Sequence, residues 1–403
     1  MPVQAPAKPG TQGKATAPPV RRQPFPVGVL KVENPDYDVT QTQTTGVQQY
    51  PNHSFEPTGW LRGLWYQFDM TVSGQSTNSV SFAGDNPFSV INKFTLKDVG
   101  NREVFGPMGG YDWMTINKFG GYWDMGDPRS DLAFSTVVGT GGTGGTFTFV
   151  LYVPLELVAR DALGAVENKA TSSAWKAELF IDSQANTYNQ VPSVQGSLRV
   201  RVTEDGYTEP AAADEHGRPL SQTPPAVGTL QYWVTENSGG IGGASGTLNY
   251  NLDNGIGYSI RNIIWSLRRS GTSRANGDAD WPDPVTVTYG KVQLFQRYKT
   301  TWITKMARAY AFTVNNGTVA SGALAGTPDS AMQRENGVFP QWFTDDFSGV
   351  AGGELRNGYL NTKTGTVLKW KGTLGGSASA DQLNALINYV IPPNNDPGRL
   401  RAR

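Results

Sequence analysis

The sequence predicts an all-β protein with a few short helices, organised as two similar domains in tandem. The first observation is composition: of 403 residues only 17% are charged, while 48 are Gly and 26 are Pro. This mixture is typical of short strands joined by tight turns, and the length suffices for two cores. The second observation is an internal similarity, because residues 88–94 and 258–264 share the pattern aromatic, Ser, β-branched, any, Asn, any, apolar. We interpret the two copies as equivalent strands of a duplicated unit.

Positive charge is concentrated at the two ends of the chain. Residues 1–24 combine six prolines with four cations and no acid, which predicts a disordered basic arm. Either this arm is a plain disordered terminus, or it becomes ordered against neighbouring subunits, anionic lipid or nucleic acid. Residues 392–403 are expected to form a second basic tail. The cations concerned are Lys8, Lys14, Arg21 and Arg22 in the arm and Arg399, Arg401 and Arg403 in the tail.

Composition also limits how the fold can be stabilised. The chain has no Cys, so disulfides and thiolate metal sites are excluded, and packing and hydrogen bonding must hold the fold. The apolar run 147–159 is too short to span a membrane and contains Glu156. The N-terminus lacks the apolar region of an export signal. We therefore expect neither an export signal nor a membrane span.

The expected N-terminal domain covers residues 55–203. Apolar side chains alternate over residues 64–72, which predicts a half-buried strand. Residues 139–144 match the GxGxxG pattern, but a β-like segment follows where phosphate binding requires a helix, so we interpret these glycines as a hairpin loop. The other expected elements are strands over 88–99, 146–153, 175–181 and 198–202, a packed irregular loop over 101–126, and a helix over 154–166 that begins with Pro154.

Residues 204–228 are rich in Pro, Ala and charge without periodicity, and are expected to form a linker. The expected C-terminal domain covers residues 229–391, and its first strand, 230–234, resembles residues 64–68 of the first domain. A helix is expected over 300–312, and a second over 379–390, where Ser379 and Gln382 have the spacing of a capping box. The further expected strands are 248–252, 258–267, 285–295 and 367–374, with a Gly-rich loop over 239–246.

Two β-units of about 150 residues, each with about eight strands and a helix in a long connection, suit tandem eight-stranded jelly rolls. Residues 153–155, 163–166 (Leu-Gly-Ala-Val) and 176–180 (Lys-Ala-Glu-Leu-Phe) together resemble a segment of tectivirus major coat proteins. That segment leaves one strand, passes through a helix and re-enters the sheet. The resemblance implies a double jelly-roll coat protein whose trimers form pseudo-hexagonal units over an internal membrane. The proline-rich arm departs from the amphipathic helix with which such coats often begin.

The sequence contains four kinds of candidate catalytic or binding residues: histidines, paired acids, tryptophans and strand cations. His53 and His216, the two histidines, lie in irregular segments, and a metal at residues 214–216 (Asp-Glu-His) is weighed against a solvated charge run. The acids at 278–280 and 345–346 are interpreted as loop acids rather than a glycosidase pair. Loop anchoring or subunit contact is favoured over sugar stacking for Trp113, Trp123, Trp281 and Trp342. Solvated or intersubunit faces are expected for Arg199, Arg201, Lys369 and Lys371.

We therefore expect a structural protein and not an enzyme, without catalytic residues, cofactor or metal. The leading hypothesis is the major capsid protein of an icosahedral bacterial virus. Its expected partners are itself as a homotrimer, neighbouring trimers, other capsid proteins such as a vertex protein, and an anionic internal membrane. Sequence-specific nucleic-acid binding is not expected. The expected location is the virion, after assembly in the host cytoplasm. The alternatives are a carbohydrate-binding β-sandwich surface protein and a glycosidase or lyase on a jelly-roll scaffold.

Overall fold

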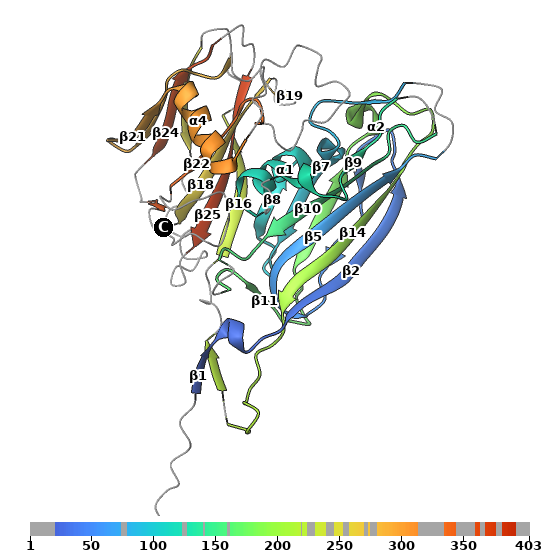
Figure 1. Cartoon of the computed structure of the whole chain (residues 1–403), viewed down its shortest axis with the longest axis vertical. Coiled ribbons are helices and arrows are strands. Elements are labelled where there is room, and N and C mark those ends of the chain that lie inside the picture. The colour runs from blue at the N-terminus through green and yellow to red at the C-terminus, as the bar shows by residue number, and fades with distance from the viewer. Residues whose placement is uncertain are drawn as a thin grey trace, which may run out of the picture.

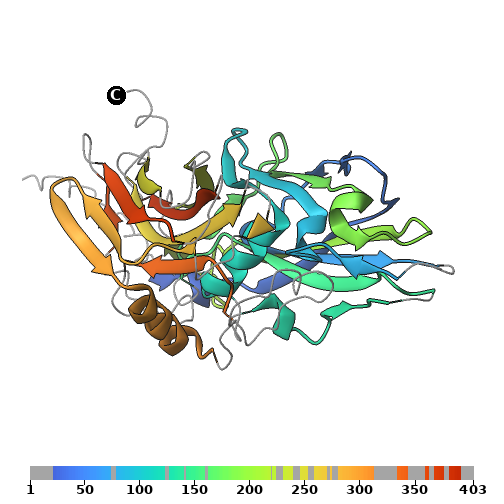
Figure 2. The same cartoon turned by 90° about the horizontal axis from the view of Figure 1, so that it is seen from above.

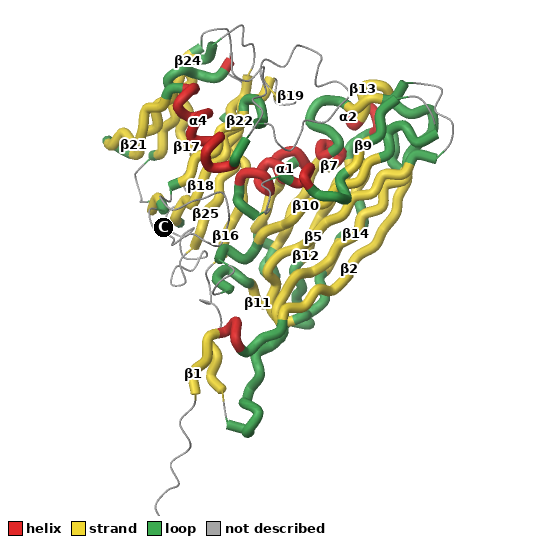
Figure 3. The backbone as a smooth tube through the Cα atoms, viewed as in Figure 1, coloured by secondary structure: helices red, strands yellow, loops and turns green. Residues whose placement is uncertain are grey.

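The computed structural model describes most of the chain, and strands dominate it (Figures 1 and 3). The described residues are 21–73, 79–122, 127–139, 142–158, 162–218, 220–223, 230–238, 246–252, 258–269, 273–274, 280–312, 334–343, 359–362, 367–375 and 381–391. The helical elements are η1 (Phe25–Val27), η2 (Phe88–Val90), α1 (Gly110–Phe119), η3 (Pro128–Ser130), α2 (Gln184–Thr187) and α4 (Lys299–Tyr310). The predicted all-β class with a few short helices is confirmed.

The first jelly roll consists of two facing sheets of antiparallel strands. One sheet has the order β2 (Lys31–Thr42), β14 (Ser197–Tyr207), β5 (Gly59–Thr71), β10 (Phe147–Pro154) and the short β9 (Ser135–Thr136), with β11 (Val166–Asn168) also on β5. The other has the order β8 (Glu103–Met108), β7 (Ile91–Lys97), β12 (Lys176–Ile181), and then β3 (Gln48–Gln49) and β4 (His53–Ser54), both on β12.

The second jelly roll repeats this topology. One of its sheets has the order β16 (Leu230–Asn237), β25 (Asp381–Ile391), β18 (Ser259–Arg269) and β22 (Val338–Trp342), with β19 (Ser273–Arg274) and β23 (Leu360–Asn361) also on β18. The other has the order β17 (Thr247–Leu252), β24 (Leu368–Thr373), β20 (Val285–Tyr289) and β21 (Val292–Arg297). If β3 and β4 are taken as one interrupted strand, both rolls show the order first, eighth, third, sixth in one sheet and second, seventh, fourth, fifth in the other. The predicted double jelly roll is therefore confirmed.

The alternation expected for residues 64–72 explains how the first roll forms its core. On β5 the side chains of Leu64, Tyr66, Phe68 and Met70 are buried, and the residues between them are only half buried. One face of the strand therefore covers the core and the other carries polar groups. The expected hairpin is also present, because β9 pairs antiparallel with β10 through Thr136 and Phe147.

The two rolls are joined by strand pairing as well as by packing. β16 pairs in parallel with β8 through Trp233 and Phe105, which fuses one sheet of each roll into an eleven-stranded sheet. A single hydrophobic cluster extends from Leu61 in the first roll to Tyr389 in the second. Figure 2 shows α1 near the middle of the molecule and α4 at the outer rim of the second roll. The two rolls therefore form one body.

The pattern from which we inferred duplication does not lie on equivalent strands. Residues 259–264 of the second copy belong to β18, the third strand of its roll, whereas 88–94 cover η2 and the start of β7, the fourth strand. Residues 64–68 likewise lie on a third strand and 230–234 on a first. Half-buried strands use few residue types, so similar short sequences occur at unrelated positions. The two rolls do repeat one topology, but the sequence pattern from which we inferred this was not evidence for it.

Helix predictions succeeded at one place and failed at two. The helix expected over 300–312 is α4, whose Trp302 and Met306 are buried. The helix expected over 379–390 is wrong, because these residues form β25 between β16 and β18. Both faces of this strand are covered, so consecutive residues from Leu383 to Ile391 are buried and, apart from Asn384 and Asn388, apolar, and they imitate a helix. Ser379 itself lies outside the described residues.

The helix expected after Pro154 is also wrong in its described part. Val158 forms a β-bridge with Leu163, and Gly164 has φ +91, a left-handed conformation that a right-handed helix excludes. Val166 then begins β11. The helix implied by the coat-protein resemblance is therefore missing here, although residues 176–180 do re-enter the sheet as β12.

Residues 101–126, expected to be irregular, contain β8 and α1 instead. This places a helix directly after the fifth strand of the first roll, as α4 follows the fifth strand of the second. Helix α1 was missed because nine of its ten residues are buried, so it has no polar face to give a helical period.

The strands also extend past the domain limits expected from the sequence. β2 begins at Lys31, before residue 55, and β14 ends at Tyr207, inside the expected linker. The last four residues of the expected disordered arm form β1 (Arg21–Pro24), which pairs in parallel with β15 (Leu220–Thr223) in that linker. A small ribbon joins β6 (Ser81–Phe82) to β13 (Tyr188–Gln190). Residues 1–20 and 392–403 lie outside the described residues, and in the described part no helix is long and apolar enough to cross a membrane.

Trp113 of α1 is expected to be a principal contact of the first core. Its ring stacks on Phe94 at 4.3 Å between centroids, and its indole N–H donates a 2.7 Å hydrogen bond to the carbonyl of Tyr152. Trp113→Ala should lower the free energy of unfolding by about 3–5 kcal/mol, as large-to-small core substitutions do. Urea unfolding measures this loss. Val292→Ala, at an exposed residue of β21, is the control, and equal effects of both variants would contradict this account of the core.

Candidate functional site

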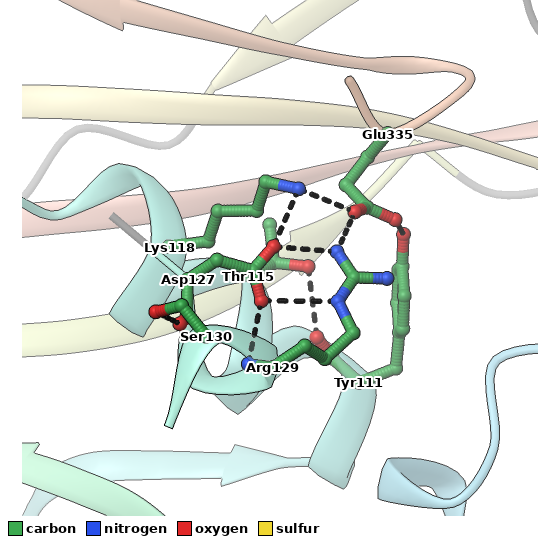
Figure 4. A network of polar contacts seen from close by, with 7 residues as sticks. All are labelled: Tyr111, Thr115, Lys118, Asp127, Arg129, Ser130 and Glu335. Carbon is green, nitrogen blue, oxygen red and sulfur yellow. Dashed lines mark hydrogen bonds and ion pairs between the residues drawn. The ribbon is translucent and has the colours of Figure 1, made fainter. Parts of the chain in front are cut away.

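Where the two rolls meet, the described residues bring together a buried group of charged side chains (Figure 4). We call it the junction network: Lys118, Asp127, Arg129 and Glu335. Lys118 lies in the last turn of α1, Arg129 lies in η3, and Asp127 is the N-cap of η3, where its side chain accepts from the Arg129 N–H. Glu335 comes from the second roll, three residues before β22. The network therefore links both halves of the molecule.

The contacts within the junction network are short, and its side chains are almost inaccessible to solvent. The ammonium of Lys118 lies 2.7 Å from a carboxylate oxygen of Asp127 and 2.7 Å from one of Glu335. The guanidinium of Arg129 contacts the same two carboxylates, 2.7 Å from Asp127 and also paired with Glu335. The second oxygen of Glu335 accepts a 2.8 Å hydrogen bond from the Tyr111 hydroxyl. No side chain of the network is more than 4% exposed.

The charges of the junction network balance, with two cations against two carboxylates. Burial acts to lower the pKa of Arg129, but the carboxylates of Glu335 and Asp127 raise it above its ordinary value. A buried charged group of this kind adds little net stability over an apolar equivalent, because removing four ions from water is costly. Removing one charged partner strongly destabilises the folded state, because it leaves the opposite charge buried and uncompensated. The network therefore favours one relative placement of the rolls.

A second set of contacts crosses the same junction from β18. Arg268 of β18 lies 3.1 Å from Asp85 and 3.1 Å from Asp112, both in the first roll, and its guanidinium covers the Tyr111 ring. Arg261 of the same strand donates a 3.0 Å hydrogen bond to the Tyr122 hydroxyl. The second roll thus supplies two cations to partners on the first.

An open cleft of about 740 Å³ lies beside Arg268, lined by both rolls. Its lining includes Asn92, Lys93, Asp112 and Asp182 from the first roll and Asn384 from the second. The lining holds no histidine, and the carboxylate of Asp112 is already paired with Arg268. Its described lining therefore offers polar contacts.

The structure places most residues considered in the sequence away from the junction. His216 is exposed in a turn where Asp214 accepts hydrogen bonds from the backbone N–H groups of His216 and Arg218. Arg199 pairs with Asp38 and Arg201 with Asp69 on the outer face of the first roll. Lys369 and Lys371 lie on β24. Arg21 and Arg22 lie in β1, and Lys8, Lys14, Arg399, Arg401 and Arg403 lie outside the described residues.

The three described tryptophans considered for sugar stacking do not form an exposed platform. Trp113 and Trp281 are buried, and Trp281 stacks on Phe339 at 4.0 Å between centroids. Trp342 is half buried beneath the guanidinium of Arg261, 4.6 Å from its ring centroid. Trp123 lies outside the described residues. The preference for packing over sugar stacking is therefore confirmed at Trp113 and Trp281, although Trp113 lies in α1 and not in a loop.

Sequence reasoning missed the junction network completely. One signal was available, because Lys118 lies between the apolar residues Ile116 and Phe119 in a segment with few other charges. A cation in such a position suggests a buried pair. Its partner Glu335 is 217 residues away, and no sequence period connects the two.

Comparison with known proteins supports the fold. No family model matches the sequence, and no curated protein matches it. A chain in the atomic structure of Sulfolobus Turreted Icosahedral Virus is similar with a TM-score of 0.59 and 12% identity, covering 93% of this chain and 95% of that one. The crystal structure of the STIV MCP is similar with a TM-score of 0.54 and 12% identity, covering 88% of this chain and 97% of that one. The major capsid protein P2 from bacteriophage PM2 is similar with a TM-score of 0.50 and 8% identity, covering 90% of this chain and 97% of that one.

These similarities span almost the whole of each chain. The protein has the double jelly-roll fold that is also found in viral major capsid proteins. At such low identities the similarity defines a fold class and leaves function to be argued separately.

Glu335→Gln should destabilise the protein because it leaves Lys118 and Arg129 with one carboxylate between them. We expect the free energy of unfolding to fall by about 3–5 kcal/mol, the cost of breaking a buried ion pair. Urea unfolding monitored by tryptophan fluorescence measures the fall.

The matched control is Glu178→Gln, which breaks a 2.6 Å pair with Lys97 whose side chains are partly exposed. This change should cost about 1 kcal/mol or less. A loss at Glu335 no larger than that at Glu178 would show that the junction network does not hold the rolls together.

Proposed function

We propose that the protein is the structural coat subunit of an icosahedral virus and acts as a homotrimer. The observation that carries the proposal is the fusion of two jelly rolls of identical strand order into one body, through β8 and β16 and the junction network. Three such chains around a threefold axis present six similar lobes, so the trimer can occupy a nearly hexagonal lattice site. This role needs no catalytic step.

The comparisons support a capsid role because two of the similar structures are described as major capsid proteins. Both resemble this chain over nearly its full length. Jelly rolls serve many functions, so a single roll would support the proposal weakly. Two fused rolls of matching topology are a much more restricted arrangement, and tiling a shell is a function that uses their near-equivalence.

A bacterial host, an internal membrane and a vertex protein as partner extend this proposal. β1 projects from one end of the two rolls (Figure 1), so we expect Lys8 and Lys14 to act at that end. Cations near an anionic bilayer gain about 1 kcal/mol each, which suits an arm that faces membrane lipid. The cations Arg399, Arg401 and Arg403 are proposed to contact neighbouring subunits. Assembly is proposed to take place in the host cytoplasm.

Native mass spectrometry of the purified full-length protein tests the oligomeric state. We expect a species with three times the mass of the chain at neutral pH, present across a tenfold dilution. A monomer that is retained on a polysaccharide column would contradict the coat-protein proposal and favour the carbohydrate-binding alternative.

Lys8→Ala combined with Lys14→Ala tests membrane contact by the arm. Because two cations are removed, we expect affinity for vesicles containing anionic lipid to fall by about 2 kcal/mol, roughly 30-fold, and to weaken further with salt. Vesicle co-sedimentation measures this affinity.

The matched control is Lys369→Ala with Lys371→Ala, which removes the same charge from β24. This control should bind anionic vesicles as the unmodified protein does. Equal losses in both double variants would show that net charge, and not the arm, determines binding.

A further inference from the structure

A second buried polar group lies inside the first jelly roll, away from the junction. Asp36, His53 and Glu204 each present one side-chain atom able to bind a metal, and these atoms lie within 4.8 Å of one another. Glu204 is 1% exposed and His53 is 5% exposed. Asp36 lies on β2 and Glu204 on β14 in one sheet, while His53 lies on β4 of the facing sheet. The group therefore bridges the two sheets.

A β-bulge directs Asp36 into this position. Tyr37 pairs with Val202 and Pro35 with Thr203, so Asp36 is the extra residue between them. Asp36 and Tyr37 are consequently both half buried, where regular alternation would turn one of them outward. Glu204 extends the inward series of Val200 and Val202 on β14, which places a carboxylate where the pattern calls for an apolar side chain.

The hydrogen bonds within the roll leave this group incompletely satisfied. Asp36 lies 2.6 Å from Nε2 of His53, and one oxygen of Glu204 accepts a 3.1 Å hydrogen bond from the Thr58 hydroxyl. The other oxygen of Glu204 and Nδ1 of His53 are buried and have no hydrogen-bond partner. Buried polar atoms usually have a partner, so the second oxygen of Glu204 is available to a ligand.

The charges point in the same direction. Two carboxylates in an apolar core repel each other unless a proton or a cation lies between them. The core thus disfavours two negative charges here and would be relieved by a positive ion.

We propose that Asp36, His53 and Glu204 form a binding site for a divalent transition metal, with Zn²⁺ as the best fit. Imidazole and carboxylate are ordinary Zn²⁺ ligands, whereas Mg²⁺ and Ca²⁺ prefer oxygen ligands alone. Metal–ligand distances of about 2.0–2.2 Å place tetrahedral ligands about 3.3 Å apart. Nε2 of His53 must therefore withdraw slightly from Asp36, and Glu204 must approach. Water completes the fourth position.

The proposed metal would act as a cross-link within the first roll. It would tie β2 and β14 of one sheet to β4 of the facing sheet, at a place where β4 is only two residues long. Since the unfolded chain cannot preserve this geometry, metal binding would stabilise the folded state. The inference does not depend on the coat-protein function.

Metal titration of the full chain, purified without a polyhistidine tag and freed of metal with EDTA, tests the site. By isothermal titration calorimetry we expect one Zn²⁺ per chain, and by thermal unfolding an increase in Tm of a few degrees at saturating Zn²⁺. Mg²⁺ at the same concentration should leave Tm unchanged. The absence of saturable Zn²⁺ binding would overturn the proposal and indicate that a proton is shared between the two carboxylates.

Glu204→Gln separates loss of the metal site from loss of the fold. The new amide can still accept the hydrogen bond from Thr58, and it removes the repulsion with Asp36. The metal-free variant should therefore be at least as stable as the unmodified protein. Its Zn²⁺ affinity should fall at least about 100-fold, because even outer-shell partners are worth 10–100-fold. Unchanged Zn²⁺ affinity in this variant would overturn the proposal.

The two histidines of the chain provide a matched pair of variants. His53→Gln should abolish the Zn²⁺-dependent increase in Tm, and His216→Gln, at the exposed histidine beside Glu215, should leave it intact. The reverse result would overturn the proposal by placing the metal at residues 214–216.

Discussion

The structure depends on the requirement that buried charges be fully compensated where the two jelly rolls meet. Lys118 and Arg129 have almost no contact with solvent, and they are neutralised only when Glu335 of the second roll is in place. A small rotation of one roll against the other would separate these charges in a medium that cannot screen them. The apolar core binds the rolls together, and the junction network selects one arrangement among the many that apolar packing would tolerate.

The two rolls share their topology but not the environment of their helices. α1 and α4 each follow the fifth strand of a roll. α1 lies at the junction with nine residues buried, whereas only Trp302 and Met306 of α4 are buried. The same connection thus serves as an internal spacer in one roll and as an outer cover in the other. This asymmetry distinguishes the two lobes of the molecule.

Sequence periodicity predicted secondary structure reliably where a segment has one solvent-exposed face, and unreliably where a segment has no exposed face. Half-buried strands such as β5 and the amphipathic helix α4 were predicted because solvent imposes a period of 2 or 3.6 on their side chains. β25 and α1 are covered on all sides, so their sequences carry no such period. The residues from which duplication was inferred lie on non-equivalent strands, although the two rolls do share one strand order.

The sequence by itself determined the β-rich class, the division into two β-units and most half-buried strands, because these follow from local composition and from alternation against water. Only the tertiary structure decided which strands are equivalent and which charges meet. Glu335 reaches Lys118, and Glu204 reaches Asp36, through sheet pairing and packing between segments far apart in the chain. Such contacts arise from the register of distant strands and from the bulge at Asp36, and no local pattern of residues specifies them.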